Sequence, residues 1–556
     1  MNLFFTVILL FLPLAVGYFI YGFFLKRFFR LDDARKTPAH VHRDGIDFEP
    51  TNKYYLLGQH LSAIAAAGPI IGPILAGMWF GWGPAVLWII LGGVFVGGVH
   101  DMSALIASIR HGGKSIAEVV KAHMPKRAFI LFLIFLWFSL MYIITAFTDI
   151  TVNTFVDPVN GGKVASSSMM YLALALIMGI AVQKFKLGLK TATAIFTPLI
   201  FICIYAGNWL PLNVPAMFGM DQRQVWNLLL IVYCFIASVI PVWLLLQPRG
   251  YLGGFFLAGT VFISFIGILV GSIFGNLRVE YPVFISWYNP AGLPMFPLLF
   301  ITIACGACSG FHSLVASGTT SRQLDKETDT ALVGYGGMLL ESVVAIIALA
   351  TLMALGTAQV KELKDPNMIY ASGIATFLNS LGISKAFALN FALLAFATFV
   401  YDTLDVATRL GRYIFEELFN LRNAYSRYIA SFITLLLPAI FLMQKIVDDT
   451  GNTIPAWKVF WTVFGASNQL LAGFVLFIVS LWLYRHRMKY IHILIATVFM
   501  LVTSMVSLVL LVKPTIARII SGNFALGPID ITAFILLGLS VFLILEGIAI
   551  FAKKGR

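Results

Sequence analysis

Residues 59–84 read QHLSAIAAAGPIIGPILAGMWFGWGP, an apolar stretch of membrane-spanning length with two Gly-Pro steps near its middle. Each proline lacks a backbone N–H and disfavours helix at the residue before it, so Gly68-Pro69 and Gly72-Pro73 predict an interrupted helix. In hydrocarbon, carbonyl groups freed by such a break are tolerated only where they line a cavity or contact protein. Secondary transporters build substrate and ion sites from discontinuous helices of this kind. The stretch therefore indicates transport.

The composition is that of an integral membrane protein. Hydrophobic residues make up 60% of the 556 residues and charged residues 11%, which excludes a soluble globular chain. Apolar runs long enough to cross the hydrocarbon core recur about 15 times and predict an all-α fold with about 15 transmembrane helices. An enzyme is not expected, because no Ser-His-Asp order, nucleotide-binding loop or zinc motif stands out. No cofactor is expected beyond a coupling ion.

The positive charges give an orientation. The net charge is +13, and most of the 38 Lys and Arg residues fall in segments that are cytoplasmic if the first loop is cytoplasmic. This positive-inside bias predicts an N-terminus outside and a C-terminus in the cytoplasm. The basic excess is thus an orientation signal, and the lipid bilayer rather than nucleic acid is the expected partner. The first span, residues 3–25, ends in Lys26-Arg27 and is expected to be retained rather than cleaved.

A second interrupted span is predicted at residues 226–250, where ASVIPVWLLLQPRG contains Pro241 and Pro248. It lies five spans after the first and starts on the opposite side of the membrane. Two five-helix units in opposite orientation are typical of inverted-repeat transporters. The expected organisation is a first helix and basic loop at 1–58, repeat 1 at 59–210, repeat 2 at 226–408 and further spans at 409–556.

Small and hydroxyl-bearing residues gather in the span at 296–317. Ser309, Ser313 and Ser317 recur every four residues and so share one face of a helix. A row of hydroxyls opposite unwound carbonyl groups would suit Na⁺, a hard cation that prefers oxygen ligands, whereas packing between helices is the alternative. Cys305 and Cys308 are attributed to such packing, since no His or Cys partner is expected nearby.

Ionisable residues inside spans are expensive and therefore informative. Glu341 either carries a coupling proton or is a permanently satisfied structural acid. Asp402 is a further candidate for coupling. Asp405 and Arg409 are four residues apart, and an ion pair on one helix face is expected for them. Arg249 could bind an anionic substrate, whereas anchoring the chain at the cytoplasmic side is the role expected for it.

Five collinear segments resemble the carbon starvation protein A family of bacterial inner-membrane transporters: residues 59–73, 241–251, 304–320, 334–342 and FGASNQLLAG at 464–473. The resemblance implies a leucine-transporter-like fold, with a core of two inverted five-helix repeats. It also implies proton- or cation-coupled uptake of pyruvate or small peptides during nutrient limitation. In that fold the substrate lies between the first and sixth core helices, and a sodium site between the first and eighth.

Carried over by position, the resemblance places backbone of the two Gly-Pro steps at the substrate and the hydroxyls of Ser309 and Ser313 at the ion. Asn468-Gln469 falls outside the ten-helix core and is interpreted as an interhelical hydrogen-bond clamp. His60 and His312 either report pH or form hydrogen bonds with neighbouring helices.

The sequence therefore predicts a secondary symporter that works by alternating access in the bacterial inner membrane. A membrane sensor of the same metabolites and a channel are the alternatives, and the choices between peptide and pyruvate and between H⁺ and Na⁺ stay open. Residues predicted to bind substrate are Gln59, His60, Gly68, Pro69, Gly72, Pro73, Pro241 and Gln247. Residues predicted to couple the ion are Ser309, Ser313, Glu341 and Asp402.

Overall fold

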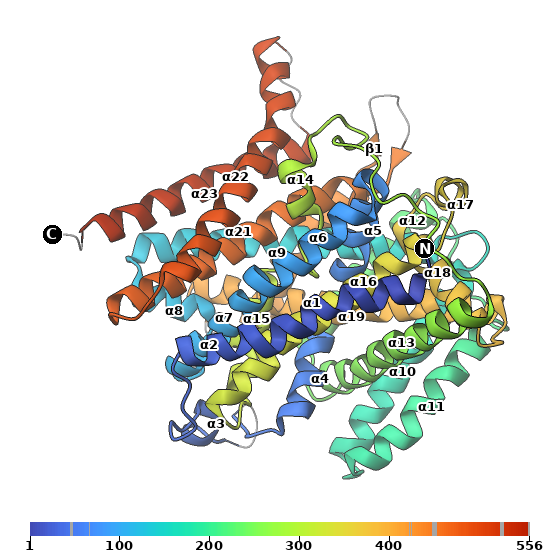
Figure 1. Ribbon diagram of the computed structural model, residues 1–556, viewed down its shortest axis with the longest axis horizontal. Helices are drawn as coiled ribbons and strands as arrows, with labels where there is room; N and C mark the ends of the chain where they lie inside the picture. Colours follow the sequence, from blue (N-terminus) through green and yellow to red (C-terminus); the bar gives the residue numbers. More distant parts are fainter. Residues whose placement is uncertain are drawn as a thin grey trace.

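Helices dominate the computed structural model, which describes residues 1–556 except 45–47, 66, 422, 424, 448–452, 523–526 and 554–556 (Figure 1). Within the described residues, the only sheet is a hairpin of β1 (Ile446–Val447) and β2 (Thr453–Ile454). The predicted all-α class is confirmed.

Thirteen helical segments of the described chain are long and apolar enough to span a membrane. They are α1 with η1 and α2 (Leu3–Val16, Gly17–Tyr21, Gly22–Phe28), α6 with η2 and α7 (Trp82–Gly92, Gly93–Gly97, Gly98–Arg110), α9 (Lys126–Phe155), α10 (Gly161–Gln183), α11 (Leu189–Gly207), α12 (Gln222–Val239), α13 (Leu246–Phe274), η4 with η5 and α16 (Glu327–Asp329, Ala331–Gly336, Gly337–Met353), α19 (Lys385–Leu418), α20 (Ser426–Met443), α21 (Ala456–Arg485), α22 (Ile491–Ile520) and α23 (Pro528–Lys553). Shorter elements are α3 (Pro38–Val41), α8 (Ile116–His123), η3 (Thr320–Arg322), α17 (Thr357–Leu363) and α18 (Pro366–Asn379). The remaining predicted spans, 59–77 and 296–317, are interrupted.

The first interruption lies between α4 (Lys53–Ile64) and α5 (Gly68–Phe80), which meet at an angle of 51°. Pro69 lies in the first turn of α5, where its missing N–H would have had no helical partner. Gly72 and Pro73 lie within the continuous α5, so the expectation that the second Gly-Pro step also breaks the helix is wrong. Pro73 removes a single hydrogen bond near the helix start, and the chain there stays helical.

The second interruption is not at 226–250 as predicted. Residues 240–245 separate α12 from α13, but each of these helices is long enough to span by itself, so Pro241 lies in a connection between two spans. Pro248 falls in the first turn of α13, where proline is tolerated. The second interrupted span is 295–318, where non-helical residues 303–310 separate α14 (Met295–Thr302) from α15 (Phe311–Gly318).

The two interrupted spans pack against each other through glycines of α5. A Cβ atom on Gly72 would lie 2.5 Å from the carbonyl oxygen of Thr302. A Cβ atom on Gly68 would collide with the side chain of Cys305. Glycine is therefore required at both positions, because the two interrupted spans approach each other closely there.

Glycines of two further elements approach the same stretch. A Cβ atom on Gly97 of η2 would collide with the carbonyl oxygen of Ala307, and one on Gly465 of α21 with that of Ile301. The end of α14 and the non-helical segment are thus enclosed by bare backbone of α5, η2 and α21.

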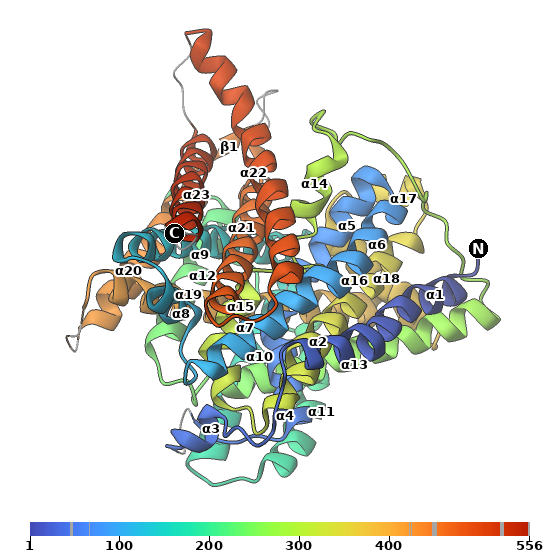
Figure 2. The same cartoon turned by 60° about the vertical axis from the view of Figure 1, so that its left-hand side comes forward.

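A similar order of elements follows each interruption. The α4–α5 pair is followed by the span α6–α7, short α8 and long α9, and the α14–α15 pair by η5–α16, short α17 and α18, and long α19. Helices α9 and α19 pack along each other, α13 packs against α4, and α21 packs against α14 and α15. In both views α10 and α11 lie at one edge of the molecule and α22 and α23 at the opposite edge (Figures 1 and 2).

Candidate functional site

A buried cluster of ionisable side chains lies beside the interruption between α14 and α15. His312 of α15 contacts Asp101 of α7 through Nδ1 at 2.7 Å and approaches Glu341 of α16 through Nε2 at 3.3 Å. The exposed fraction of all three side chains is 0%. One imidazole, the centre of what we call the His312 cluster, thus lies between two carboxylates from two other elements.

The hydrogen bonds of Asp101 determine which ring nitrogen of His312 donates a hydrogen bond and which can gain or lose a proton. One carboxylate oxygen contacts Nδ1 of His312 and the other contacts Nδ1 of His100, each at 2.7 Å. Because a carboxylate only accepts, Nδ1 of His312 donates, and its Nε2 is the atom that gains or loses a proton. Nε2 and both oxygens of Glu341 have no hydrogen-bond partner among the described residues. Since buried polar atoms normally have partners, these are the atoms at which a proton or a ligand group is expected to bind.

His60, predicted to bind substrate, lies close to this cluster. It is buried on α4, and its Nδ1 forms a hydrogen bond of 2.9 Å with the hydroxyl of Thr320. Its ring faces Gly337, about one turn before Glu341 on α16, with Cδ2 3.1 Å from the position of a Cβ atom on that glycine. His60 thus forms the hydrogen bond to a neighbouring element that was the alternative to a pH-reporting role. Its Nε2 faces α16.

The start of α5 faces the same break. Ala67 at the N-cap supplies no side-chain hydrogen bond, and Pro69 has no N–H. The partial positive charge of the helix start is therefore not offset by a side-chain cap. Gly68 contacts Cys305, and Pro69 lies within 3.5 Å of the position of a Cβ atom on Gly306. The N–H groups of Ile70 and Ile71 bond to the carbonyl oxygen of Ala67, so an anionic group here would meet the positive charge of the helix start rather than a row of free N–H groups.

Asn468 and Gln469 of α21 hold the non-helical segment in place. Asn468 accepts a hydrogen bond of 2.9 Å from the N–H of Phe311 and donates one of 3.0 Å to the hydroxyl of Ser309. Gln469 donates to the carbonyl oxygen of Cys308 at 2.9 Å. The predicted clamp is confirmed, and its target is the second interruption itself.

The serines do not form the predicted row. Ser309 belongs to the non-helical segment, so it does not share a helix face with Ser313 and Ser317 on α15. Ser313 donates to the carbonyl oxygen of Gly310 at 2.6 Å, and Ser317 donates to that of Ser313 at 2.6 Å. The hydroxyl hydrogens are thus used within the chain, because an early helical turn offers them carbonyl groups.

The non-helical segment also brings Cys305 close to His312, a proximity that the sequence does not predict. The sulfur of Cys305, a ring nitrogen of His312 and an oxygen of Glu341 lie within 4.8 Å of one another. Three donors are fewer than the four of a closed structural zinc site. His312 and Glu341 already face each other at 3.3 Å, and we interpret the group as an ionisable cluster rather than a metal site.

Three predicted substrate residues lie elsewhere. The side chains of Pro241 and Gln247 are exposed, and Gln59 is half-buried on α4. No contact among the described residues links them to the His312 cluster. Pro241 and Gln247 lie outside the cluster because the second interruption is at residues 303–310, far from residues 240–247 along the chain.

Asp402 belongs to a different buried site, which we call the Arg249 cluster. Nε of Arg249 contacts Asp402 at 2.8 Å, and its Nη1 contacts Asp405 at 2.7 Å. The guanidinium is fully buried, so the expectation of a cytoplasmic anchor is wrong. The expected Asp405–Arg409 pair is also replaced, since Arg409 donates to the carbonyl groups of Ala237 and Ile240 at the end of α12.

Asp101 and His312 are the residues that sequence reasoning does not assign to the site. Both are ionisable residues within predicted spans, and His100-Asp101 closes a glycine-rich run. The energetic cost of placing ionisable groups in a membrane span is the signal that the sequence gives for these two residues. The sequence does not predict that they pair with each other, because the pairing depends on how α7 packs against α15.

Comparison with known proteins gives one consistent group of relatives. A family model described as carbon starvation protein CstA matches residues 2–369 and 351–507. The peptide transporter CstA of Helicobacter pylori is 33% identical over 538 residues, with 85% of this chain and 76% of that protein covered. The peptide transporter CstA of Escherichia coli is 30% identical, with 88% and 78% covered. The pyruvate/proton symporter BtsT of Escherichia coli is 29% identical, with 83% and 74% covered.

Two solved structures are similar at low sequence identity. MhsT in complex with L-phenylalanine is 12% identical, with a TM-score of 0.48 and coverage of 90% of this chain and 98% of that one. The manganese transporter of Eremococcus coleocola is 13% identical, with a TM-score of 0.47 and coverage of 90% and 94%.

Proposed function

The chain belongs to the carbon starvation protein CstA family, and from this premise we propose that it is a secondary active symporter for small peptides or pyruvate. Substrate and coupling ion bind at the two interruptions, and the site opens to one side of the membrane at a time. The observation that carries the proposal is His312, held between Asp101 and Glu341 where α14 gives way to α15. Broken helices with ionisable groups at their breaks are how such transporters place their sites.

The substrate part of the site is formed by backbone. Gly68 and Pro69 at the start of α5 face residues 303–310, whose backbone is not helical. Both expected substrates carry a carboxylate, and the positive end of α5 suits that group. His60, with its free Nε2, completes this side of the site.

A proton is the coupling ion. Nε2 of His312 and the oxygens of Glu341 can share or exchange a proton across 3.3 Å, whereas Ser309 and Ser313, the residues predicted to hold Na⁺ together, do not share a helix face. Asp402, the other predicted coupling acid, is held by Arg249, which keeps its proton. The similarity to a relative named a pyruvate/proton symporter supports the same choice.

The inverted repeats take new boundaries. Repeat 1 runs from α4 to α13, with α10 and α11 inserted, and repeat 2 runs from α14 to α21, in place of 59–210 and 226–408. The matching order of elements and the matching contacts of α13 with α4 and of α21 with α14 and α15 support this division. The positive-inside bias supports an N-terminus outside and a C-terminus in the cytoplasm of a bacterium's inner membrane.

The test is uptake by purified protein in proteoliposomes. Labelled pyruvate and a labelled dipeptide are offered with an inward proton gradient or an inward sodium gradient imposed separately. Glu341→Gln removes the carboxylate that exchanges the proton, so proton-driven accumulation is expected to be lost while exchange of internal for external substrate persists. Glu546→Gln is the matched control, since this acid lies on α23 and pairs with Arg127 at 2.6 Å, away from the His312 cluster.

Accumulation by Glu341→Gln at the wild-type level would contradict the coupling role. Counterflow separates the functional classes, because a pore cannot drive labelled substrate against its gradient and a sensor moves nothing. Absence of counterflow with both substrates in the wild-type protein would overturn the transport proposal.

A further inference from the structure

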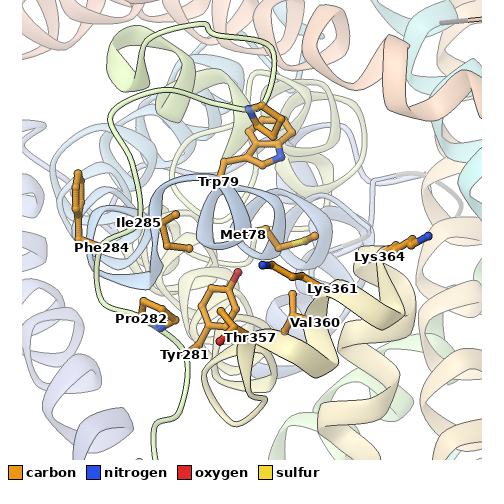
Figure 3. A pocket seen from close by; sticks show the side chains of 11 residues that line it. Met78, Trp79, Tyr281, Pro282, Phe284, Ile285, Thr357, Val360, Lys361 and Lys364 are labelled. Atoms are coloured by element: carbon orange, nitrogen blue, oxygen red, sulfur yellow. The ribbon is translucent and has the colours of Figure 1, made fainter. Parts of the chain in front are cut away.

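A pocket lies at the end of α5 that is far from the His312 cluster. Its cavity volume is about 560 Å³. It is formed by the last turns of α5, the segment that leads from α13 to α14, and the short helix α17 (Figure 3). Its lining includes Met78, Trp79, Tyr281, Phe284, Lys361 and Lys364. We call it the α5–α17 pocket.

The wall of this pocket is mostly apolar and aromatic. Trp79 comes from α5, and Tyr281 and Phe284 from the segment before α14, with prolines at 282 and 290 completing that side. Pockets of a few hundred Å³ with such walls and a few polar groups are the usual form of a small-molecule site. The volume suits a molecule with one or two side chains rather than a three-carbon acid.

The polar part of the pocket carries one sign of charge. Lys361 and Lys364 lie three residues apart on α17 and at its end, and no acidic residue lines the pocket. Both lysines are exposed, and no ion pair joins either to an acidic residue within the described chain. Figure 3 shows the ammonium end of Lys361 toward Met78 and Lys364 at the outer margin, with its ammonium end pointing away from the group. Nearby Asp365 is already held by Lys458 at 2.9 Å.

The position of the pocket links it to transport. α5 runs from Gly68 at the break to Phe80 beside the pocket, so one helix lines both places. The pocket lies on the face of the N-terminus, since the N–H of Val279 bonds to the carbonyl oxygen of Met1 next to the lining segment. That face is the outer one in the proposed orientation.

We propose that the α5–α17 pocket is an outer binding site for a short peptide with a free C-terminal carboxylate. Lys361, whose ammonium end lies toward Met78, binds the carboxylate, Lys364 adds positive charge at the margin, and the aromatic wall accepts an apolar side chain. This inference rests on the proposed transport function and deepens it, because it selects peptides from the two expected substrates and gives them a first binding place.

The experiment compares Lys361→Gln/Lys364→Gln with wild type in the same proteoliposomes. The probes are a labelled dipeptide with apolar side chains, the same dipeptide amidated at its C-terminus, and labelled pyruvate. Loss of one charge-assisted contact and of a second nearby positive charge is expected to raise the KM for the free dipeptide by about tenfold while the maximal rate stays near wild type. Lys385→Gln and Lys184→Gln together, at two exposed lysines outside the pocket, are the control matched for net charge.

The amidated dipeptide should have the same high KM in wild type and in the double variant, and Lys361→Arg/Lys364→Arg should restore use of the free dipeptide. An unchanged KM for the free dipeptide, or an equal rise in the KM for pyruvate, would overturn the site. Wild-type transport of pyruvate without transport of the dipeptide would also overturn it, yet would leave the proposed symport intact. Failure of both substrates to be transported would instead refute the proposed function.

Discussion

The His312 cluster and the Arg249 cluster are built alike: in each, one basic side chain lies between two carboxylates away from solvent. They differ in where the acids come from. Asp402 and Asp405 lie one turn apart on α19, so both ion pairs of Arg249 connect α13 to one helix. Asp101 and Glu341 come from α7 and α16, so His312 joins three elements.

They differ also in the chemistry of the base. A guanidinium keeps its proton at any physiological pH, and its ion pairs are permanent. An imidazole can be neutral or charged in that range, so its contacts change when a proton arrives or leaves. We therefore interpret the Arg249 cluster as structural and the His312 cluster as the place where transport is coupled. The same count of charges serves two purposes because one of the two bases can titrate.

The largest expected effect comes from Arg249→Met. It leaves Asp402 and Asp405 buried with no counter-charge, and the free energy of unfolding should fall by about 3–5 kcal/mol. Thermal unfolding of the purified protein in detergent measures this loss. Arg223→Met is the control, since its partner Asp149 is buried but the Arg223 side chain is 25% exposed and the penalty is correspondingly smaller. Equal stability of Arg249→Met and wild type would show that this cluster is not structural.

Asp101→Asn should separate stability from function in the other cluster. The amide oxygen can still accept from Nδ1 of His312, so the expected loss of stability is only about 1–3 kcal/mol. Proton-driven accumulation should nevertheless be lost, because His312 no longer has a charged partner on that side. Uptake under a proton gradient and thermal unfolding are measured on the same preparation. If accumulation persists, the comparison fails and the His312 cluster is structural as well.

The smallest expected effect concerns a histidine outside the spans. Burial and the neighbouring His111 and Arg485 lower the pKa of His123 from 6.5 to about 4, and its Nε2 lies 2.9 Å from that of His111. Between these pH values the unfolded chain binds a proton at His123 that the folded chain does not. The contribution of neutral His123 to the free energy of unfolding is therefore fully present above pH 6.5 and is lost as the pH drops toward 4.

His123→Gln should reduce this loss, measured as the difference in melting temperature between pH 7 and pH 5. His42→Gln, at an exposed histidine, should leave the difference unchanged. Proton-driven uptake should be the same in both variants, since His123 has no carboxylate partner among the described residues; a change in uptake would extend the titrating site beyond His312.

The sequence predicts well those features that depend on local chemistry. The break before Gly68 follows from Pro69, and the spans follow from hydropathy over segments of membrane length. The second interruption escapes such reasoning, because residues 303–310 contain no proline and are held open by Asn468 and Gln469 from α21. Pro241 suggests a break but lies between two complete spans.

The pairing of charges is the part that a linear pattern cannot supply. Arg249 stands near a predicted membrane boundary, yet α13 continues as a helix and buries its side chain against α19. Asp405 has Arg409 four residues away on the same helix, but Arg409 instead donates hydrogen bonds to two carbonyl groups at the C-terminal end of α12. Helix-end hydrogen bonds and packing outweigh the i, i+4 pair, whose contribution is only about 0.3–0.5 kcal/mol at a surface.

The glycines at 72, 97 and 465 bring main chain against main chain around the second interruption, with no side chain between them to change rotamer. Local loop rearrangement has little room there, because every neighbour is as stiff as the segment itself. Making space for a solute in this part of the molecule would require α5, η2 and α21 to tilt together. Such a collective motion takes microseconds to milliseconds, longer than the local motion of a single loop.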